Sequence, residues 1–142
     1  MQPLQCSASD RDQHNWDVLI LDQTGWLPVV YGHAAVVVIG GSFVNHGGHN
    51  LLEAAAQRRA IIIGPHVQHF ESVVEEFHRA GAILWLHSHL ELSPALHSLL
   101  GDSIRQIELG QVAGKVLESR RGAARHYAHI VLDKLEKSTL PS

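Results

Sequence analysis

The sequence predicts an α/β protein built on a partial, doubly wound parallel β-sheet that is followed by C-terminal helices. Two observations predict this class. Short apolar runs rich in β-branched residues alternate with helical segments between residues 17 and 86, which is typical of a parallel sheet covered on both faces. Three of these runs are followed by loops that contain glycine, and such sheets bind ligands at the carboxyl ends of their strands.

Each predicted element follows from its composition. Strands are expected where apolar residues run without alternation, because a strand covered on both faces is apolar throughout. The helix at 51–59 is rich in alanine and leucine, with Asn50 suited to cap it and with Arg58 and Arg59 placed favourably for the helix dipole. In chain order we expect strand 17–21, helical segment 27–33, strand 35–39, helix 51–59, strand 60–63, helix 70–80 and strand 82–86.

Beyond Leu90 the sequence predicts helices only, a short one at 93–100 and a longer one at 112–137. Apolar residues recur along the longer helix at helical spacing, which favours one apolar face. Gly122 interrupts this pattern and predicts a break or a kink. The residues of the apolar stripe are Val116, Tyr127, Ile130, Val131 and Leu135.

The composition predicts one domain. A chain of 142 residues with 45% hydrophobic residues can bury one core, and we divide it into a polar leader, 1–15, and a folded part, 16–142. The net charge of −3 gives no general attraction to nucleic acid or to an anionic membrane. A single cysteine, Cys6, fits a reducing compartment. No signal peptide or membrane-spanning run is visible, so any membrane association is expected to be peripheral.

The stretch from Gly40 to Ala56 predicts a ligand site. Gly47 and Gly48 leave a loop without side chains before the helix, so an anion can approach backbone N–H groups where the helix dipole favours it. Glu53 lies one turn into that helix, where its carboxylate can accept hydrogen bonds from sugar hydroxyls beside a phosphate. The alternative is that Asn50 and Glu53 only cap the helix. The spacing matches neither a dinucleotide fingerprint nor a P-loop.

Two other chemistries are not expected. Twelve histidines include close pairs, but zinc sites combine such pairs with cysteine or acidic ligands at a defined spacing, so we predict no metal site. His49 and His66 lie on the predicted ligand edge and remain open as residues that shape the pocket. Ser42 follows two glycines but lacks the G-x-S-x-G elbow, so we do not expect a nucleophile there.

Three ordered blocks, spread over Asp17 to Phe70, resemble the C-terminal domain of 3-deoxy-D-manno-octulosonic acid (Kdo) transferases, which are glycosyltransferases of the GT-B class. Asp22–Leu27, followed by Tyr31, is similar to the family's D-T-x-G-E-L…Y. Gly40–Ala55 is similar to its G-G-S…G-G-H-N-x-x-E-A-A, and Gly64–Phe70 to its G-P-H…F. The resemblance implies a Rossmann-like fold, the C-terminal half of a GT-B enzyme.

The resemblance also implies an activity, the transfer of Kdo from CMP-Kdo to a lipid A precursor in lipopolysaccharide synthesis. It implies no metal or other cofactor, no nucleic-acid partner, and a peripheral location on the cytoplasmic face of the bacterial inner membrane. Trp26 stands where the family usually has glutamate, and an indole offers a ring for stacking but no hydrogen-bond acceptor. By position, the expected CMP-binding residues are Thr24, Gly25, Trp26, Asn50, Leu51, Leu52 and Glu53.

In the family an N-terminal domain carries the membrane-proximal anchor, the acceptor site and the proposed catalytic base. Residues 16–142 resemble only part of the C-terminal, CMP-Kdo-binding domain, so we expect a fragment that is soluble by itself and holds no catalytic residue. Two alternatives stay open. One is a non-catalytic or remnant nucleotide-binding module, and the other is a GT-B transferase or epimerase that uses a different nucleotide sugar.

Overall fold

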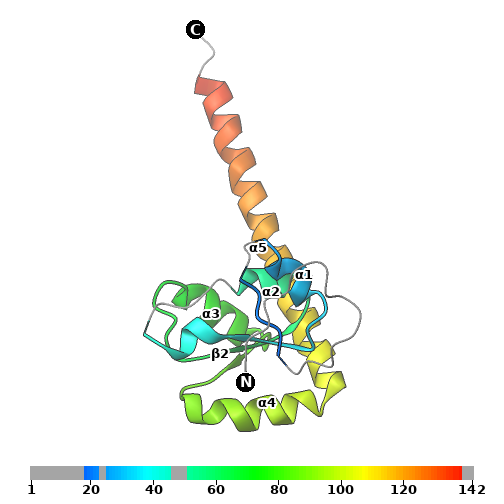
Figure 1. Ribbon diagram of the computed structural model, residues 1–142. Helices are drawn as coiled ribbons and strands as arrows, with labels where there is room; N and C mark the ends of the chain where they lie inside the picture. Colours follow the sequence, from blue (N-terminus) through cyan, green and yellow to red (C-terminus); the bar gives the residue numbers. More distant parts are fainter. Residues whose placement is uncertain (1–17, 23–24, 46–50, 139–142) are drawn as a thin grey trace.

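The computed structural model describes residues 18–22, 25–45 and 51–138, with side chains up to residue 124. The expected polar leader, 1–15, lies outside the described residues. Helices and strands alternate up to β3, and only helices follow it (Figure 1). In order, the elements are α1 (Leu27–Tyr31), β1 (Val36–Ile39), the 3₁₀ helix η1 (Gly40–Phe43), α2 (Leu52–Ala56), β2 (Ala60–Ile63), α3 (Glu71–Arg79), β3 (Leu84–Trp85), the 3₁₀ helix η2 (His89–Glu91), α4 (Leu92–Leu100) and α5 (Ser103–Ser138).

The described strands form a three-stranded parallel sheet in the order β1-β2-β3. Val36 lies opposite Ala60 and Ile39 opposite Ile63, so β1 and β2 pair along their whole length. Helix α2 connects β1 to β2, and α3 connects β2 to β3, which is the crossover that parallel strands require. The predicted α/β class is therefore confirmed.

Apolar residues cover both faces of the sheet. Figure 1 shows α1, α2 and α3 on one side of the sheet and α4 on the other. Residues of β1 and β2 alternate between the two cores, as side chains of a strand must. The first core joins Val37, Ile39, Ile61 and Ile63 to Ala54, Ala55, Val74, Phe77, Ala113 and Leu117. The second joins Ala60 and Ile62 to Leu86, Leu99 and Leu109.

The strand expected at 17–21 is not formed by the described residues. Only Ile20 makes an isolated bridge, and the large side chains from Val18 to Leu21 are 39–60% exposed. An apolar run becomes a strand only where it is paired along its length and buried, and here one bridge forms while the side chains stay largely exposed. The strand expected at 82–86 is likewise reduced to Leu84–Trp85. The prediction of four strands was therefore wrong for the described part of the chain.

Helix α2 ends at Ala56, three residues before the predicted end at Arg59. Arg58 adopts a left-handed conformation with φ of 52°. The Arg58 N–H then donates to the Ala55 carbonyl and the Arg59 N–H to the Ala54 carbonyl, which is a Schellman turn. Glycine usually occupies this left-handed position, so the sequence carries no signal for it.

Helix α5 is continuous from Ser103 to Ser138 and passes through Gly122 without a break. The prediction of a break or kink was wrong, because one glycine lowers the stability of a helix by only about 1 kcal/mol. The C-terminal part of α5 projects away from the rest of the molecule (Figure 1). Among the described helices, none combines the length and apolar character that crossing a bilayer requires.

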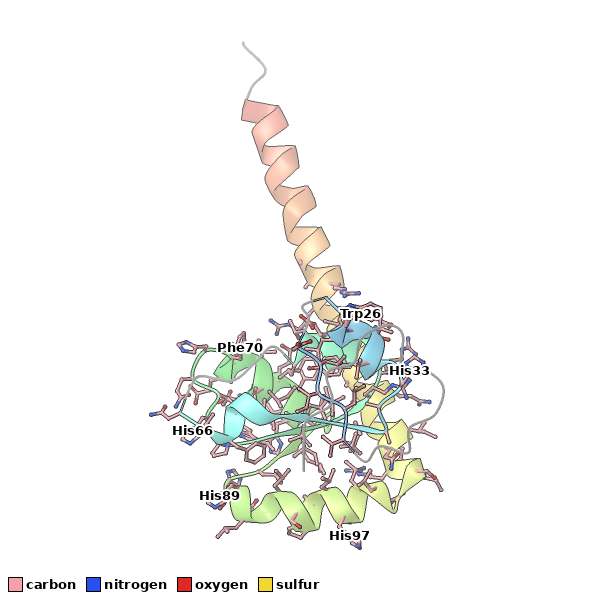
Figure 2. All side chains as sticks on the ribbon, viewed as in Figure 1. Trp26, His33, His66, Phe70, His89 and His97 are labelled. Atoms are coloured by element: carbon pink, nitrogen blue, oxygen red, sulfur yellow. The ribbon has the colours of Figure 1, made fainter. Side chains whose placement is uncertain are left out.

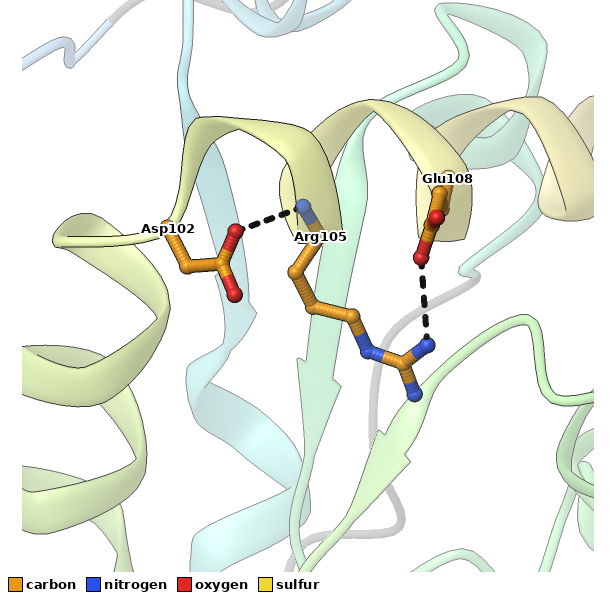
Figure 3. Close-up of polar contacts among 3 residues, drawn as sticks. All are labelled: Asp102, Arg105 and Glu108. Carbon is orange, nitrogen blue, oxygen red and sulfur yellow. Dashed lines mark hydrogen bonds and ion pairs between the residues drawn. The ribbon is translucent and has the colours of Figure 1, made fainter.

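The start of α5 is capped by Asp102 (Figure 3). Its Oδ1 accepts a hydrogen bond of 2.9 Å from the Arg105 N–H, which has no partner within the helix. Arg105 also pairs with Glu108 at 3.5 Å, but both side chains are more than half exposed, so this pair adds little stability. From the apolar stripe we expected this helix to begin at residue 112. The cap at Asp102 explains why it begins earlier, at Ser103.

Replacement of Asp102 by alanine is expected to lower the free energy of unfolding by about 1 kcal/mol, because it removes this acceptor. Asparagine retains a side-chain oxygen, and Asp102→Asn is expected to keep most of the stability. Urea denaturation followed by circular dichroism measures both. An equal loss in the two variants would show that the charge, rather than the cap, stabilises α5.

Candidate functional site

Hydrogen bonds tie together the carboxyl ends of all three strands. The Ser42 hydroxyl donates to the Ile39 carbonyl at 2.5 Å and accepts from the Gly64 N–H at 2.6 Å. The Trp85 indole donates to the Gly64 carbonyl at 3.1 Å. These two hydrogen bonds of Ser42 connect the loops after β1 and β2. Ser42 is fully buried, so its hydroxyl is not accessible to a substrate, in keeping with the expectation that it is not a nucleophile.

A cavity of about 480 Å³ opens beside the carboxyl end of β1. It brings together α1 from the first sequence block and the glycines and Glu53 from the second. Gly40 has open space where a Cβ would stand, so a ligand can reach the backbone there. The lining residues are Leu27, Tyr31, Val38, Ile39, Gly40, Gly41 and Glu53.

Glu53 also lines a second cavity, of about 610 Å³, on the side of α5. This cavity has an apolar wall and carries Arg120 and Arg121 at its edge. Arg120 already contacts Glu76. Basic residues occur between 115 and 137, far along the chain from Glu53. The sequence therefore did not indicate that two of them line a cavity together with Glu53. The lining residues are Pro28, Leu52, Glu53, Ala56, Gln57, Leu117, Arg120, Arg121 and Ala124.

The third sequence block lies elsewhere on the rim. Figure 2 places His66 and Phe70 at one end of the sheet and Trp26 over α1, away from them. The His66 N–H donates to the Ser42 carbonyl at 2.9 Å, so the loop after β2 is connected to η1. None of its residues lines the cavities that contain Glu53. The block therefore supports the rim and does not form the cavity wall.

The structure describes five of the seven predicted CMP-binding residues. Gly25 precedes α1 with φ of 92°, a value that favours glycine. Trp26 is 49% exposed, and its carbonyl accepts the N–H groups of Val29 and Val30 at the start of α1. Leu51 is 2% exposed and belongs to the core, so its side chain is not available to a ligand, whereas Leu52 and Glu53 line the second cavity. Thr24, Asn50 and the Gly47–Gly48 pair lie outside the described residues.

Glu53 is exposed and forms no ion pair with another described residue. Its charge still acts on a neighbour across the smaller cavity. Burial raises the pKa of the Tyr31 phenol above its usual value of 10.0, and the Glu53 carboxylate raises it further. Tyr31 is therefore a neutral hydrogen-bond donor over the physiological range. We included Tyr31 in a sequence block but assigned it no role.

Within the described part of the chain, no three His, Cys, Asp or Glu residues come together as metal ligands do. His66 is half-buried beside the rim. The His46 and His49 pair falls in the stretch 46–50, outside the described residues. The cavities therefore offer a carboxylate, a phenol, two guanidinium groups and open backbone, which suit a ligand that carries hydroxyl groups and an anion.

Known proteins with similar sequences agree on one family. The 3-deoxy-D-manno-octulosonic acid transferase of Haemophilus influenzae is 29% identical over 133 residues, which are 93% of this chain and 31% of that protein. The protein of the same name from Bordetella pertussis is 36% identical over 84% of this chain and 27% of its own length. This chain thus spans less than a third of either relative. No family model matches it.

A solved structure agrees with these relatives. The crystal structure of the C-terminal CMP-Kdo binding domain of WaaA from Acinetobacter baumannii matches with a TM-score of 0.63 and 28% identity. The match covers 68% of this chain and 51% of that one. The parallel sheet, with a cavity at the carboxyl end of β1, thus defines a Rossmann-like α/β domain. More specifically, this chain is related to the C-terminal domain of the Kdo transferases, as the three blocks predicted.

Proposed function

We propose that residues 16–142 form part of the donor-binding domain of a Kdo transferase and hold the CMP portion of CMP-Kdo. The observation that carries this proposal is that the exposed residue Glu53 lines one cavity with Gly40 and Gly41, and that the backbone of Gly40 is open there. This is the arrangement that a ribose next to a phosphate requires, since a carboxylate accepts from two hydroxyls while backbone without side chains admits the phosphate. The relatives named above support the choice of donor.

In the proposed reaction an acceptor hydroxyl attacks the anomeric carbon of Kdo from the face opposite the phosphate. The new glycosidic bond forms as the bond to CMP breaks, so the configuration inverts and CMP leaves with the electron pair. The hydroxyl proton passes to a base that we place outside this chain. The described residues would bind and orient the donor, a contribution that lowers the barrier by holding the reacting groups in line.

Among the seven residues predicted from the sequence, we assign the direct polar contact to Glu53. Trp26 would offer its exposed ring to the base or ribose by stacking, in place of a carboxylate contact. Leu51 would contribute only through its backbone, because its side chain is in the core. Thr24, Gly25, Asn50 and Leu52 remain part of the proposed CMP site.

The acceptor and the cellular location extend the same proposal. A lipid A precursor would meet the donor at the surface of the cytoplasmic leaflet of the bacterial inner membrane, with this domain held there peripherally. Neither metal ions nor nucleic acid enters the proposed reaction.

Titration calorimetry of this chain with CMP, UMP and UDP tests the proposal. We expect CMP to bind in preference to the two uridine nucleotides. Glu53→Ala is expected to weaken CMP binding at least tenfold, because hydrogen bonds to a charged group contribute about 1.5–3 kcal/mol each. Glu71→Ala is the matched control, since Glu71 is also exposed in the first turn of a helix but lines neither cavity.

Other outcomes would point to different functions. A preference for UDP would indicate a GT-B enzyme with another donor. A folded chain that binds no nucleotide would indicate a non-catalytic module, for which the substitution of the family's glutamate by Trp26 is the supporting observation. Equal losses in Glu53→Ala and Glu71→Ala would show that Glu53 has no specific contact with CMP.

A further inference from the structure

The residues that follow α1 and α2 are in contact with each other. The Arg59 guanidinium, just before β2, donates to the carbonyl of Gly32, which ends α1. A Cβ at Gly32 would stand 3.5 Å from the Gln57 side-chain oxygen, so the ends of the two helices are in close contact. This connection sets the position of Tyr31, the residue before Gly32, relative to the helix that carries Glu53.

Tyr31 is half-buried and packs against the core that includes Ala54 and Ala55 of α2. Tyr31 and Glu53 line the same cavity of about 480 Å³, and Glu53 is the one charged residue among the described residues that line it. The influence of Glu53 on the phenol pKa agrees with this proximity. A neutral phenol is a hydrogen-bond donor and a carboxylate an acceptor, and the two residues share this cavity without a hydrogen bond between them in this structure.

We propose that Tyr31 is a positioning residue of the donor site, whose hydroxyl donates to the Glu53 carboxylate when the donor is bound and orients it toward the ribose hydroxyls. A carboxylate has about four lone-pair positions on two oxygens. One bond from Tyr31 fixes the rotation of the group and leaves the remaining positions for the sugar. The inference rests on the proposed function, since it assigns Tyr31 to the same ribose site.

A spectroscopic titration tests the proximity of Tyr31 and Glu53 without a ligand. The chain has two tyrosines, so a Tyr127→Phe background leaves Tyr31 as the only phenol, whose ionisation is followed by absorbance near 295 nm. Because a nearby negative charge disfavours the phenolate, Glu53→Gln is expected to lower the pKa of Tyr31. Burial remains in this variant, so the pKa stays above its usual value. An unchanged titration curve would show that the two groups are not close, and it would overturn the proposal.

A double-mutant cycle tests the positioning role. Tyr31→Phe keeps the ring and removes the hydroxyl, and it is expected to weaken CMP binding about fivefold, the effect of one hydrogen bond. In the Glu53→Gln background the same substitution is expected to change CMP affinity by less than about twofold, since coupled residues do not act additively. For 2′,3′-dideoxycytidine monophosphate, which lacks the ribose hydroxyls, wild type and Tyr31→Phe are expected to bind equally.

The outcomes separate the two claims. If the wild-type chain is folded and does not bind CMP, the proposed function and this inference both fail. If the wild type binds CMP and Tyr31→Phe binds it equally well, only the inference fails. It also fails if Tyr31→Phe weakens the dideoxynucleotide as much as CMP, because Tyr31 would then contact the ligand without acting through Glu53. Circular dichroism spectra establish that each variant is folded.

Discussion

Replacement of Gly110 by alanine is expected to lower the free energy of unfolding by about 2–3 kcal/mol, although alanine is the better helix former. A Cβ at this position would stand 2.0 Å from the Arg58 carbonyl oxygen and 2.7 Å from its carbonyl carbon. Both are backbone atoms of the Schellman turn after α2, so no side-chain rotation can relieve the overlap. The helix must move away from β2, and the core around Leu109 and Ala113 opens.

Gly122→Ala is the matched control, because it makes the same change within the same helix. Nothing lies within 4 Å of a Cβ at Gly122, so only helix propensity acts, and stability is expected to rise by up to about 1 kcal/mol. Urea denaturation followed by circular dichroism compares the two variants. A Gly110→Ala protein as stable as wild type would show that α5 does not pack on the Arg58 backbone as described.

Replacement of Ser42 by alanine is expected to destabilise the protein by about 2–3 kcal/mol, because a buried polar group loses its partner. The variant leaves the Gly64 N–H without an acceptor and also removes the bond to the Ile39 carbonyl. Water cannot easily replace the lost hydroxyl, because Ser42 is fully buried. The two backbones are also tightly packed there, since a Cβ at Gly64 would lie only 2.6 Å from the Ser42 carbonyl oxygen.

Ser98→Ala controls for this substitution, because Ser98 is exposed on α4. Its stability is expected to stay within about 0.5 kcal/mol of wild type. Thermal and urea unfolding of both variants provide the comparison. If Ser42→Ala and Ser98→Ala were equally stable, the hydrogen bonds that join the strand ends would contribute nothing net to folding.

The elements that were predicted well are those buried on both faces. Strand β2 has the predicted bounds, Ala60–Ile63, and all four of its residues are buried. The run 17–21 is also apolar, yet it forms only a bridge at Ile20. Large apolar residues dominate both runs, but their surroundings differ, since β2 has a strand on each side and helices over both faces. Apolar pattern alone therefore could not distinguish them.

The sequence placed Gly40, Gly41 and Glu53 in one continuous stretch, and the structure brings these three residues to one cavity, because a strand, a loop and a helix that follow one another hold their residues close together. The glycines that we expected to admit the anion, Gly47 and Gly48, lie outside the described residues. The contacts of Glu53 with its surroundings could not be found in this way. Tyr31 reaches the cavity through the Arg59–Gly32 contact, and Arg120 and Arg121 through the packing of α5.

By itself the sequence determined the α/β class, the parallel strands, the family resemblance and the position of the glycine-lined rim, because all of these depend on local pattern. The tertiary structure alone decided where α2 ends, that Leu51 is a core residue, and which side chains face Glu53. These depend on close approach between segments far apart in the chain, as where Gly110 meets Arg58. Packing at that distance is set by which surfaces bury one another, and no single segment contains that information.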